Sequence, residues 1–153
     1  MNQTLKPNWT PWGNPQTVVE IADGIVWYTT AGHGGCWLSD ERLAQLSPAL
    51  RAWQSFTGPN WYEEDCDWVF PFLCFAEEFF HSTSWRLLLV GDDLDSEEAY
   101  KNWLNAAHKT IDLRPEYYDN RFTAKAPFRE TIEQWRCSGR RPLIITLAGG
   151  QPA

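Results

Sequence analysis

One histidine in a glycine-rich stretch is the best single candidate for catalytic chemistry. His33 lies at the centre of the sequence AGHGG, and glycines allow a ligand to approach the backbone closely. Imidazole titrates near neutral pH, so His33 with Glu64 or Asp67 could act as a general acid and base or bind a metal ion. The same pattern also fits a glycine-rich connection in which the histidine has no chemical role.

Acidic residues are concentrated in the middle of the chain and suggest a different kind of site. Residues 61–100 carry eleven acidic side chains and one basic one, a net charge of −10, whereas the whole chain carries −7. Such a surface repels phosphate and attracts a basic protein surface, although acids also gather at helix N-termini for purely structural reasons. The predicted partner-binding residues are Glu63, Glu64, Asp67, Asp92, Asp93, Asp95, Glu97 and Glu98.

The last third of the chain is basic. Residues 101–153 carry nine basic and five acidic side chains, a net charge of +4. These basic groups could contact nucleic acid, but their moderate, interspersed charge favours pairing with acids of the same protein or exposure to solvent. They include Arg114, Arg121, Lys125, Arg129, Arg136, Arg140 and Arg141.

Familiar catalytic and cofactor-binding motifs are missing from the sequence. There is no HExxH, no GxSxG and no phosphate-binding GxxxxGK pattern, and the acids at 92–98 lack the glycine spacing of a calcium loop. No two cysteines have CxxC spacing, so we expect reduced thiols, with a zinc site as the alternative. The cysteines are Cys36, Cys66, Cys74 and Cys137. We therefore predict no cofactor.

The composition is that of one globular domain. With 153 residues, of which 43% are apolar and 22% charged, the chain can bury a core without disulfides or a metal. Ten tryptophans supply much of that core, and any left on the surface are favoured contact residues. Residues 1–16 do not resemble a signal peptide, and no apolar run is long enough to span a bilayer. We expect a cytoplasmic protein without a membrane partner.

The element expected to position His33 is a β-meander. Residues 17–30 contain two β-branched runs on either side of Asp23 and Gly24, which is the signal of a hairpin with a type I′ turn. A third strand is predicted at 36–38, after the glycine loop. The proline-rich residues 1–16 are predicted to form an extended arm, which Trp9 and Trp12 could hold against the body.

Several helices are expected to pack against this meander in an α+β single domain spanning residues 1–153. Capping residues and apolar spacing predict helices at 39–46, 47–56, 95–110 and 128–137. Apolar runs predict further strands at 84–90 and 143–147, and residues 148–153 are predicted to form a loose tail.

The central stretch, residues 60–80, is predicted to be largely helical and buried. Helical spacing would place Glu63, Glu64 and Asp67 on one face. Pro71 removes a backbone hydrogen bond, so the helix either kinks at this proline or begins near it.

Two motifs give the chain a resemblance to a known family. The first segment, residues 11–39, contains PWG, a predicted hairpin and then AGHGG followed by LS. The second segment, residues 61–68, reads WYEEDCDW. In these motifs the chain resembles an uncharacterised bacterial domain family that occurs on phages, plasmids and other mobile elements. The resemblance covers about the first half of the chain and implies no established activity. The matching positions are Pro11, Trp12, Gly13, Ala31, His33, Gly34, Gly35, Leu38, Ser39, Tyr62, Glu63, Glu64, Asp65, Cys66, Asp67 and Trp68.

Three hypotheses for function follow. Because small proteins of mobile elements often counter host defence, the resemblance and the acidic middle third favour an interaction protein that inhibits a host defence complex. Its partner would be the basic nucleic-acid-binding surface of a CRISPR effector or restriction enzyme, and its own acidic face would not bind nucleic acid. The alternative is an enzyme or ligand-binding domain in which His33 faces the acids at 63–67. The third is a structural domain that dimerises through an apolar patch.

Overall fold

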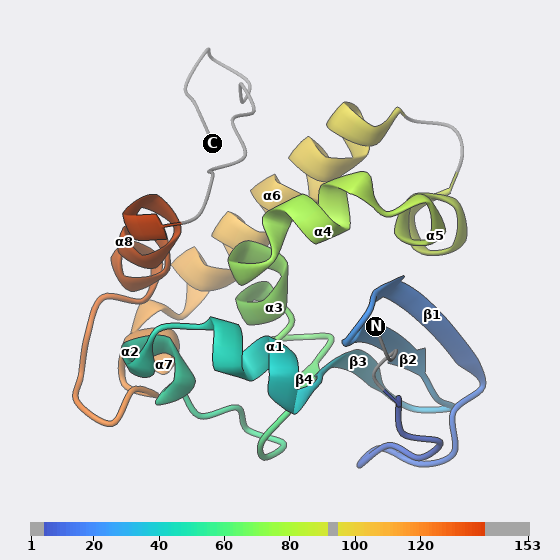
Figure 1. Cartoon of the computed structure of the whole chain (residues 1–153), viewed down its shortest axis with the longest axis horizontal. Coiled ribbons are helices and arrows are strands. Elements are labelled where there is room, and N and C mark those ends of the chain that lie inside the picture. Colours follow the sequence, from blue (N-terminus) through green and yellow to red (C-terminus); the bar gives the residue numbers. More distant parts are fainter. Residues whose placement is uncertain (1–4, 92–94, 140–153) are drawn as a thin grey trace.

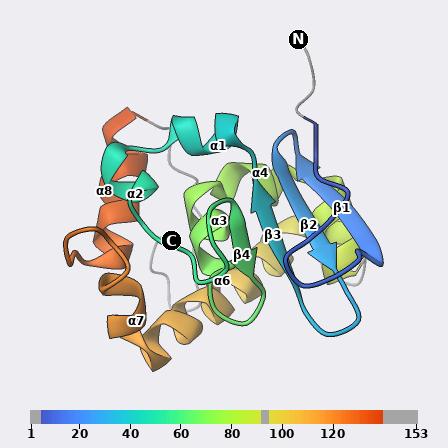
Figure 2. The same ribbon diagram turned by 90° about the horizontal axis from the view of Figure 1, so that it is seen from below.

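Four strands form an antiparallel sheet at one side of the molecule, and the helices gather on the other (Figures 1 and 2). The computed structural model describes residues 5–91 and 95–139. The sheet has the order β1-β2-β3-β4. Its strands are β1 (Thr17–Ala22), β2 (Ile25–Thr29), β3 (Gly34–Leu38) and β4 (Trp61–Glu63). This arrangement confirms the predicted α+β class and meander, to which β4 adds a strand that the sequence did not reveal.

The turn between β1 and β2 differs from the predicted type. Ala22 pairs with Ile25, so Asp23 and Gly24 form the expected two-residue connection. Gly24 has a φ of 80°, whereas Asp23 does not have a positive φ, so the turn is not type I′. The register of the hairpin also shifts between Glu20 and Ala22, close to this turn.

Both faces of the sheet are covered. The helices cover one face, while Val26, Tyr28, Trp37 and Trp61 form a smaller apolar cluster on the other. The N-terminal arm covers this cluster and runs beside the strands in Figure 2. Its residues Trp9 and Trp12 pack on Trp61 with ring centroids 5.4 and 5.6 Å away, and the Tyr28 hydroxyl donates a hydrogen bond of 2.6 Å to the Pro7 carbonyl.

Serine caps begin the first two helices, as the sequence indicates. The Ser39 hydroxyl accepts a hydrogen bond from Arg42 N at the start of α1 (Asp40–Gln45), and Ser47 caps α2 (Pro48–Arg51) in the same way. Helix α2 is shorter than predicted, because the chain turns away after Arg51. Phe56, the last residue of the predicted helix, lies outside α2 and is 76% exposed.

The central stretch is not one long helix. Glu63 ends β4, a turn follows, and the helices are α3 (Val69–Cys74) and α4 (Ala76–His81), which meet at Phe75. Pro71 is the third residue of α3, in the first turn, where its missing N–H has no intrahelical partner to lose. The helix therefore begins near Pro71, and the predicted shared face of the acids at 63–67 does not exist.

The strand predicted at 84–90 is wrong. These residues form α5 (Thr83–Trp85) and the π-helix η1 (Arg86–Val90), which ends at Gly91 with a φ of 100°. Ser82 begins this element by accepting a hydrogen bond from Trp85 N. A short apolar run has no period that separates a strand from a helix, so the cap decides the outcome. The strand predicted at 143–147 and the tail at 148–153 lie outside the described residues.

Three more helices follow in the part of the chain that the structure describes. They are α6 (Ser96–Leu113), α7 (Pro115–Asp119) and α8 (Phe128–Gly139). Asp95 caps α6, which extends beyond the predicted end at residue 110, and α7 lies where no helix was predicted. Within α6, Ala107 is buried and Ala106 is exposed. No helix in the described part of the chain is long and apolar enough to cross a membrane.

Stacked aromatic rings form the centre of the core. Trp53 lies parallel to Phe70, with ring centroids 4.8 Å apart and an angle of 7° between the planes. It also stacks against Tyr118, and its indole Nε1 donates a hydrogen bond of 3.0 Å to the Tyr118 carbonyl. Because large aromatic side chains bury the most apolar area per residue, this stack contributes much of the stabilisation of the fold.

Candidate functional site

The glycine motif AGHGG and the acidic motif YEEDCDW meet where β3 pairs with β4. Gly35 lies opposite Glu63 in the antiparallel register, so the glycine loop before β3 reaches the end of β4. His33 Nδ1 lies 3.6 Å from Glu63 Oε1, which is within the range of an ion pair but too long for a hydrogen bond. The sheet thus brings together an imidazole and a carboxylate that are far apart in sequence.

Thr30 fixes the loop that carries His33. The Thr30 side-chain oxygen accepts a hydrogen bond of 3.2 Å from His33 N. Thr30 also donates from its N–H and from its hydroxyl to the His33 carbonyl, at 2.8 and 2.7 Å. These bonds use only the backbone of His33, so its side chain, 60% exposed, keeps its ring nitrogens available to a ligand.

Glu63 is the least exposed member of the site, since its side chain is only 16% exposed. Its Oε2 accepts a hydrogen bond of 2.8 Å from Asp65 N, whereas its Oε1 is buried and has no hydrogen-bond partner. Burial raises the pKa of Glu63, and the nearby charges of Asp65 and Glu64 raise it further, although the Asp65 N–H and His33 act in the opposite direction. A cation bound at Oε1 would offset the unfavourable desolvation of the charged Glu63 carboxylate.

Asp65 completes a cluster of three potential metal ligands. One ligand atom from each of His33, Glu63 and Asp65 lies within 4.8 Å of the other two. Within residues 5–91 and 95–139, no other group of three or more His, Cys, Asp or Glu side chains is arranged closely enough to hold a metal ion. His33 and Asp65 are both exposed, so an ion could reach the cluster from solvent.

The glycines of the loop serve packing as well as the site. A Cβ at Gly35 would collide with the Tyr62 carbonyl oxygen and lie 2.7 Å from the Trp12 ring. A Cβ at Gly34 would lie 2.7 Å from the Tyr28 carbonyl oxygen and 2.9 Å from the Glu64 carboxylate. Only glycine allows the neighbouring strands and the N-terminal arm to approach β3 this closely.

Two acids that the sequence placed beside His33 lie elsewhere. Glu64 packs against Gly34 and is outside the three-ligand cluster. Asp67 was predicted to be either a catalytic or a partner-binding residue. It is fully buried, so the prediction that it is accessible to a partner is wrong. The turn after β4 directs Asp67 inward, where its carboxylate accepts hydrogen bonds from Phe56 N at 2.8 Å and from the Tyr117 hydroxyl at 2.7 Å.

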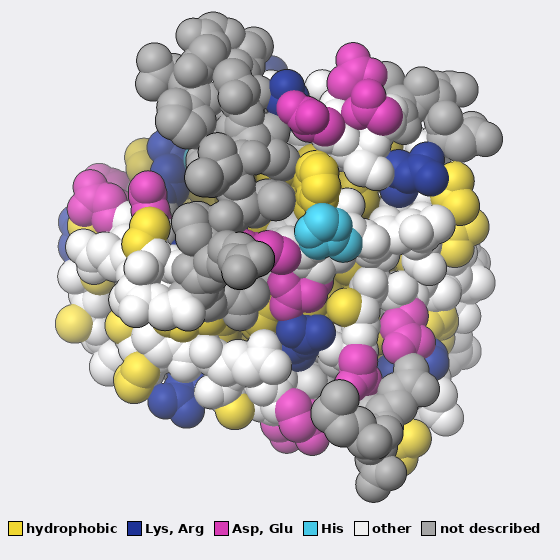
Figure 3. Space-filling view, turned by 45° about the horizontal axis from the view of Figure 1, so that its top comes forward, with side chains coloured by type: hydrophobic (Ala, Val, Ile, Leu, Met, Phe, Trp, Pro, Cys, Tyr) yellow, Lys and Arg dark blue, Asp and Glu magenta, His cyan; other side chains and the backbone are white. Residues whose placement is uncertain are grey.

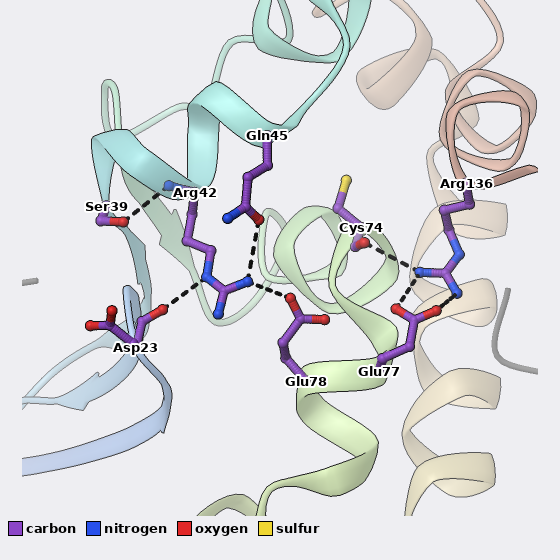
Figure 4. Close-up of polar contacts among 8 residues, drawn as sticks. All are labelled: Asp23, Ser39, Arg42, Gln45, Cys74, Glu77, Glu78 and Arg136. Carbon is purple, nitrogen blue, oxygen red and sulfur yellow. Dashed lines mark hydrogen bonds and ion pairs between the residues drawn. The ribbon is translucent and has the colours of Figure 1, made fainter. Parts of the chain in front are cut away.

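Two further acids of the middle third form ion pairs inside the molecule (Figure 4). Arg42 of α1 contacts Glu78 with 2.5 Å between Nη1 and Oε2, and Arg136 of α8 binds Glu77 through both of its terminal nitrogens, at 3.1 and 2.6 Å. These pairs tie α1 and α8 to α4. Arg136 belongs to the basic last third, so at least one arginine of that third pairs within the protein. Both pairs leave fewer acids available to a partner.

The acids at the start of α6 remain on the surface. Asp95, Glu97 and Glu98 are exposed, although Asp95 also caps the helix and Glu97 pairs with Lys101 at 3.1 Å. Asp92 and Asp93 lie outside the described residues. On the face that Figure 3 shows, acidic side chains form separate groups between basic and uncharged ones. The described acids on this face therefore do not form one continuous acidic surface.

Comparison with known proteins places the chain in a family whose function is not assigned. The family model described as Domain of unknown function (DUF7007) matches residues 5–136, and the chain belongs to this family. The match confirms the predicted resemblance to an uncharacterised domain family and extends it to nearly all of the described chain. No curated protein and no solved structure matches the chain. Fold and family together define an α+β domain whose function must be inferred from its residues.

Replacing Glu63 with glutamine is expected to raise the free energy of unfolding at pH 7. Because folding raises the pKa of Glu63 above its ordinary value of 4.5, the folded state binds this proton more tightly than the unfolded state. The contribution of Glu63 to stability is therefore present at pH values below its ordinary pKa and is lost as the pH rises through its raised pKa in the folded state. Urea titrations at pH 7 and pH 4 test this, with the exposed Glu133→Gln as control. A Glu63→Gln protein less stable than wild type at pH 7 would contradict the expectation.

Proposed function

We propose that this domain is a ligand-binding domain that holds a divalent transition-metal ion between His33, Glu63 and Asp65. The observation that carries the proposal is the buried Oε1 of Glu63, which accepts no hydrogen bond and faces an imidazole and a second carboxylate. A desolvated carboxylate oxygen without a donor is unfavourable, and a bound cation would satisfy it. This is the His33 hypothesis of the sequence, with Glu63 and Asp65 in place of Glu64 and Asp67.

The donor set indicates the class of metal and its chemistry. Imidazole nitrogen suits zinc, iron and nickel ions, and carboxylate oxygen is compatible with these and with manganese. Three protein ligands leave a coordination position for water or substrate, as in catalytic rather than structural zinc sites. A metal ion in such a site lowers the pKa of its bound water and generates a nucleophile at neutral pH. Hydrolysis is therefore the reaction class that this site would support.

Isothermal titration calorimetry with Zn²⁺ at pH 7.5 tests the proposal. The exposed thiol of Cys137 can bind zinc by itself, so the titration uses a Cys137→Ser background. One zinc ion per chain is expected to bind, and His33→Ala, Glu63→Gln and Asp65→Asn are each expected to weaken binding at least about tenfold. Protons compete for the ligands, so binding should also weaken as the pH falls.

The exposed histidine of α4 provides the matched control for this titration. His81→Ala removes an imidazole that is outside the cluster and should leave zinc affinity unchanged. Zinc binding that is equally strong in the three ligand variants would contradict the proposed site, and so would the absence of any binding.

A second candidate function rests on the acids at the start of α6. We propose that Asp95, Glu97 and Glu98, with the acidic residues 92–93 before them, bind the basic nucleic-acid-binding surface of a host defence complex. The exposure of Asp95, Glu97 and Glu98 supports this proposal, as does the net charge of −10 over residues 61–100. Asp67 has no part in this surface because it is buried.

Charge reversal separates this second function from the first. Changing Asp92, Asp93, Glu97 and Glu98 to lysine is expected to abolish the salt-sensitive capture of a nucleic-acid-binding complex from a bacterial lysate. Reversal of Glu130 and Glu133 on α8 is the control and should leave capture unchanged. Capture that persists after reversal of the α6 acids would rule out binding through this surface, whereas zinc binding should be unaffected by either set of changes.

A further inference from the structure

Two arginines stack on one tyrosine at the surface formed by α7 and its neighbours. The guanidinium carbon of Arg114 lies 4.5 Å from the Tyr117 ring centroid, and that of Arg121 lies 4.1 Å from it. Arg121 also lies 5.7 Å from the ring centroid of the exposed Phe56. Guanidinium groups stack favourably on aromatic rings, and stacking leaves their N–H edges free to bind other groups.

The positive charges of these two arginines are not neutralised within the described part of the chain. Neither guanidinium forms an ion pair there. The only hydrogen bond of the Arg121 guanidinium to a described residue is a long one of 3.5 Å to the Gln54 carbonyl. Three other arginines, Arg42, Arg129 and Arg136, each pair with a carboxylate, whereas Arg51 and Arg86 also form no ion pair within the described residues. Arg114 and Arg121 thus keep their charge available for a ligand.

The tyrosine between these arginines is held rigidly. The Tyr117 hydroxyl donates a hydrogen bond of 2.7 Å to the buried carboxylate of Asp67, which fixes the ring. Burial and this hydrogen bond raise the pKa of Tyr117, so the ring stays neutral at physiological pH. Arg114, Tyr117 and Arg121 line a surface hollow of about 620 Å³, in which Glu116 is the one carboxylate among the described lining residues and Asn120 supplies an amide. The arginines are therefore preorganised around a space large enough for a ligand.

We propose that this hollow binds a phosphate ester that carries an aromatic base, either a free nucleotide or a single-stranded nucleic acid. The guanidinium fork matches the geometry of phosphate oxygens, which it binds through two parallel hydrogen bonds. The ring of Phe56 is 76% exposed beside Arg121 and offers a flat face on which a base can stack. The residues that line the hollow belong to the basic last third of the chain and include none of the proposed metal ligands.

Binding of AMP and of a ten-nucleotide single-stranded DNA, each measured by calorimetry at low salt, tests the inference. Arg114→Gln and Arg121→Gln are each expected to weaken binding by about tenfold, and Phe56→Ala should also weaken it. Arg121→Lys keeps the charge but loses the planar fork, so an intermediate loss is expected. The control is Arg51→Gln on α2, an exposed arginine outside the hollow, which should bind like wild type.

The two probes distinguish the sources of the phosphate. Binding of AMP that depends on both arginines identifies a nucleotide site, and binding of the DNA alone with the same dependence identifies a strand-binding site. Circular dichroism of each variant establishes that it is folded. Failure of both probes to bind the wild-type protein would overturn the inference, as would equal affinity in Arg114→Gln, Arg121→Gln and Arg51→Gln.

Discussion

Replacement of Asp67 by alanine is expected to lower the free energy of unfolding by about 3 kcal/mol. The Asp67 carboxylate is fully buried and accepts hydrogen bonds from Phe56 N and from the Tyr117 hydroxyl, with Ser55 Oγ a further 3.0 Å contact. Alanine would leave these partly buried donors without their acceptor, and an unsatisfied buried donor costs about 1–3 kcal/mol. The loss would also free the loop around Phe56 and the α7 segment that Tyr117 anchors.

Urea denaturation followed by circular dichroism measures this effect. For a chain of this size the same change corresponds to a fall in melting temperature of roughly 6–12 °C. Asp67→Asn retains one acceptor oxygen and should lose less stability than alanine. The matched control is Asp65→Ala in the same turn, which removes an exposed acid and should change the free energy of unfolding by less than about 0.5 kcal/mol. Equal effects of Asp67→Ala and Asp65→Ala would contradict the buried network.

Trp53→Ala is expected to destabilise the protein by about 3–5 kcal/mol. Trp53 is 4% exposed, stacks on Phe70 and Tyr118, and donates its indole N–H to the Tyr118 carbonyl. Its removal opens a large cavity that the surrounding rings can fill only in part, and it leaves the Tyr118 carbonyl without its donor. The core between α2, α3 and α7 would lose its central side chain.

The N-terminal arm supplies the comparison for this experiment. Trp9 is 56% exposed and packs on Trp61 from one side, so Trp9→Ala should cost much less stability than Trp53→Ala. Denaturant midpoints from circular dichroism avoid the complication of ten tryptophans in a fluorescence measurement. Similar midpoints for the two variants would show that Trp53 is not central to the core.

Local signals in the sequence account for the elements that were predicted correctly. The serines at 39 and 47 and Asp95 cap helices through contacts with residues three positions away, so their effect is readable without the fold. The hairpin at 17–30 depends on a two-residue turn and is equally local. By contrast, β4 is three residues long and exists because β3 offers it a partner, and no local pattern reveals such pairing.

The composition of the site was only partly predictable. Glycines, histidine and acids indicated where chemistry could occur, but the identity of the acid depends on the end of a strand that the sequence did not show. Because β4 ends at Glu63, this residue and Asp65 lie beside His33, whereas Asp67 is directed into the core. The arginine-tyrosine hollow was missed because α7 was not predicted.

Diffraction from crystals grown with Zn²⁺, with anomalous data collected at the zinc absorption edge, tests the metal-site proposal most directly. We expect one anomalous peak per chain, coordinated by a His33 ring nitrogen at about 2.0–2.1 Å and by Glu63 and Asp65 oxygens at about 2.0–2.2 Å. The buried Oε1 of Glu63 should be one of those ligands. Crystals in which zinc binds only elsewhere, such as at Cys137, or in which the His33 region shows no anomalous density, would contradict the proposed site.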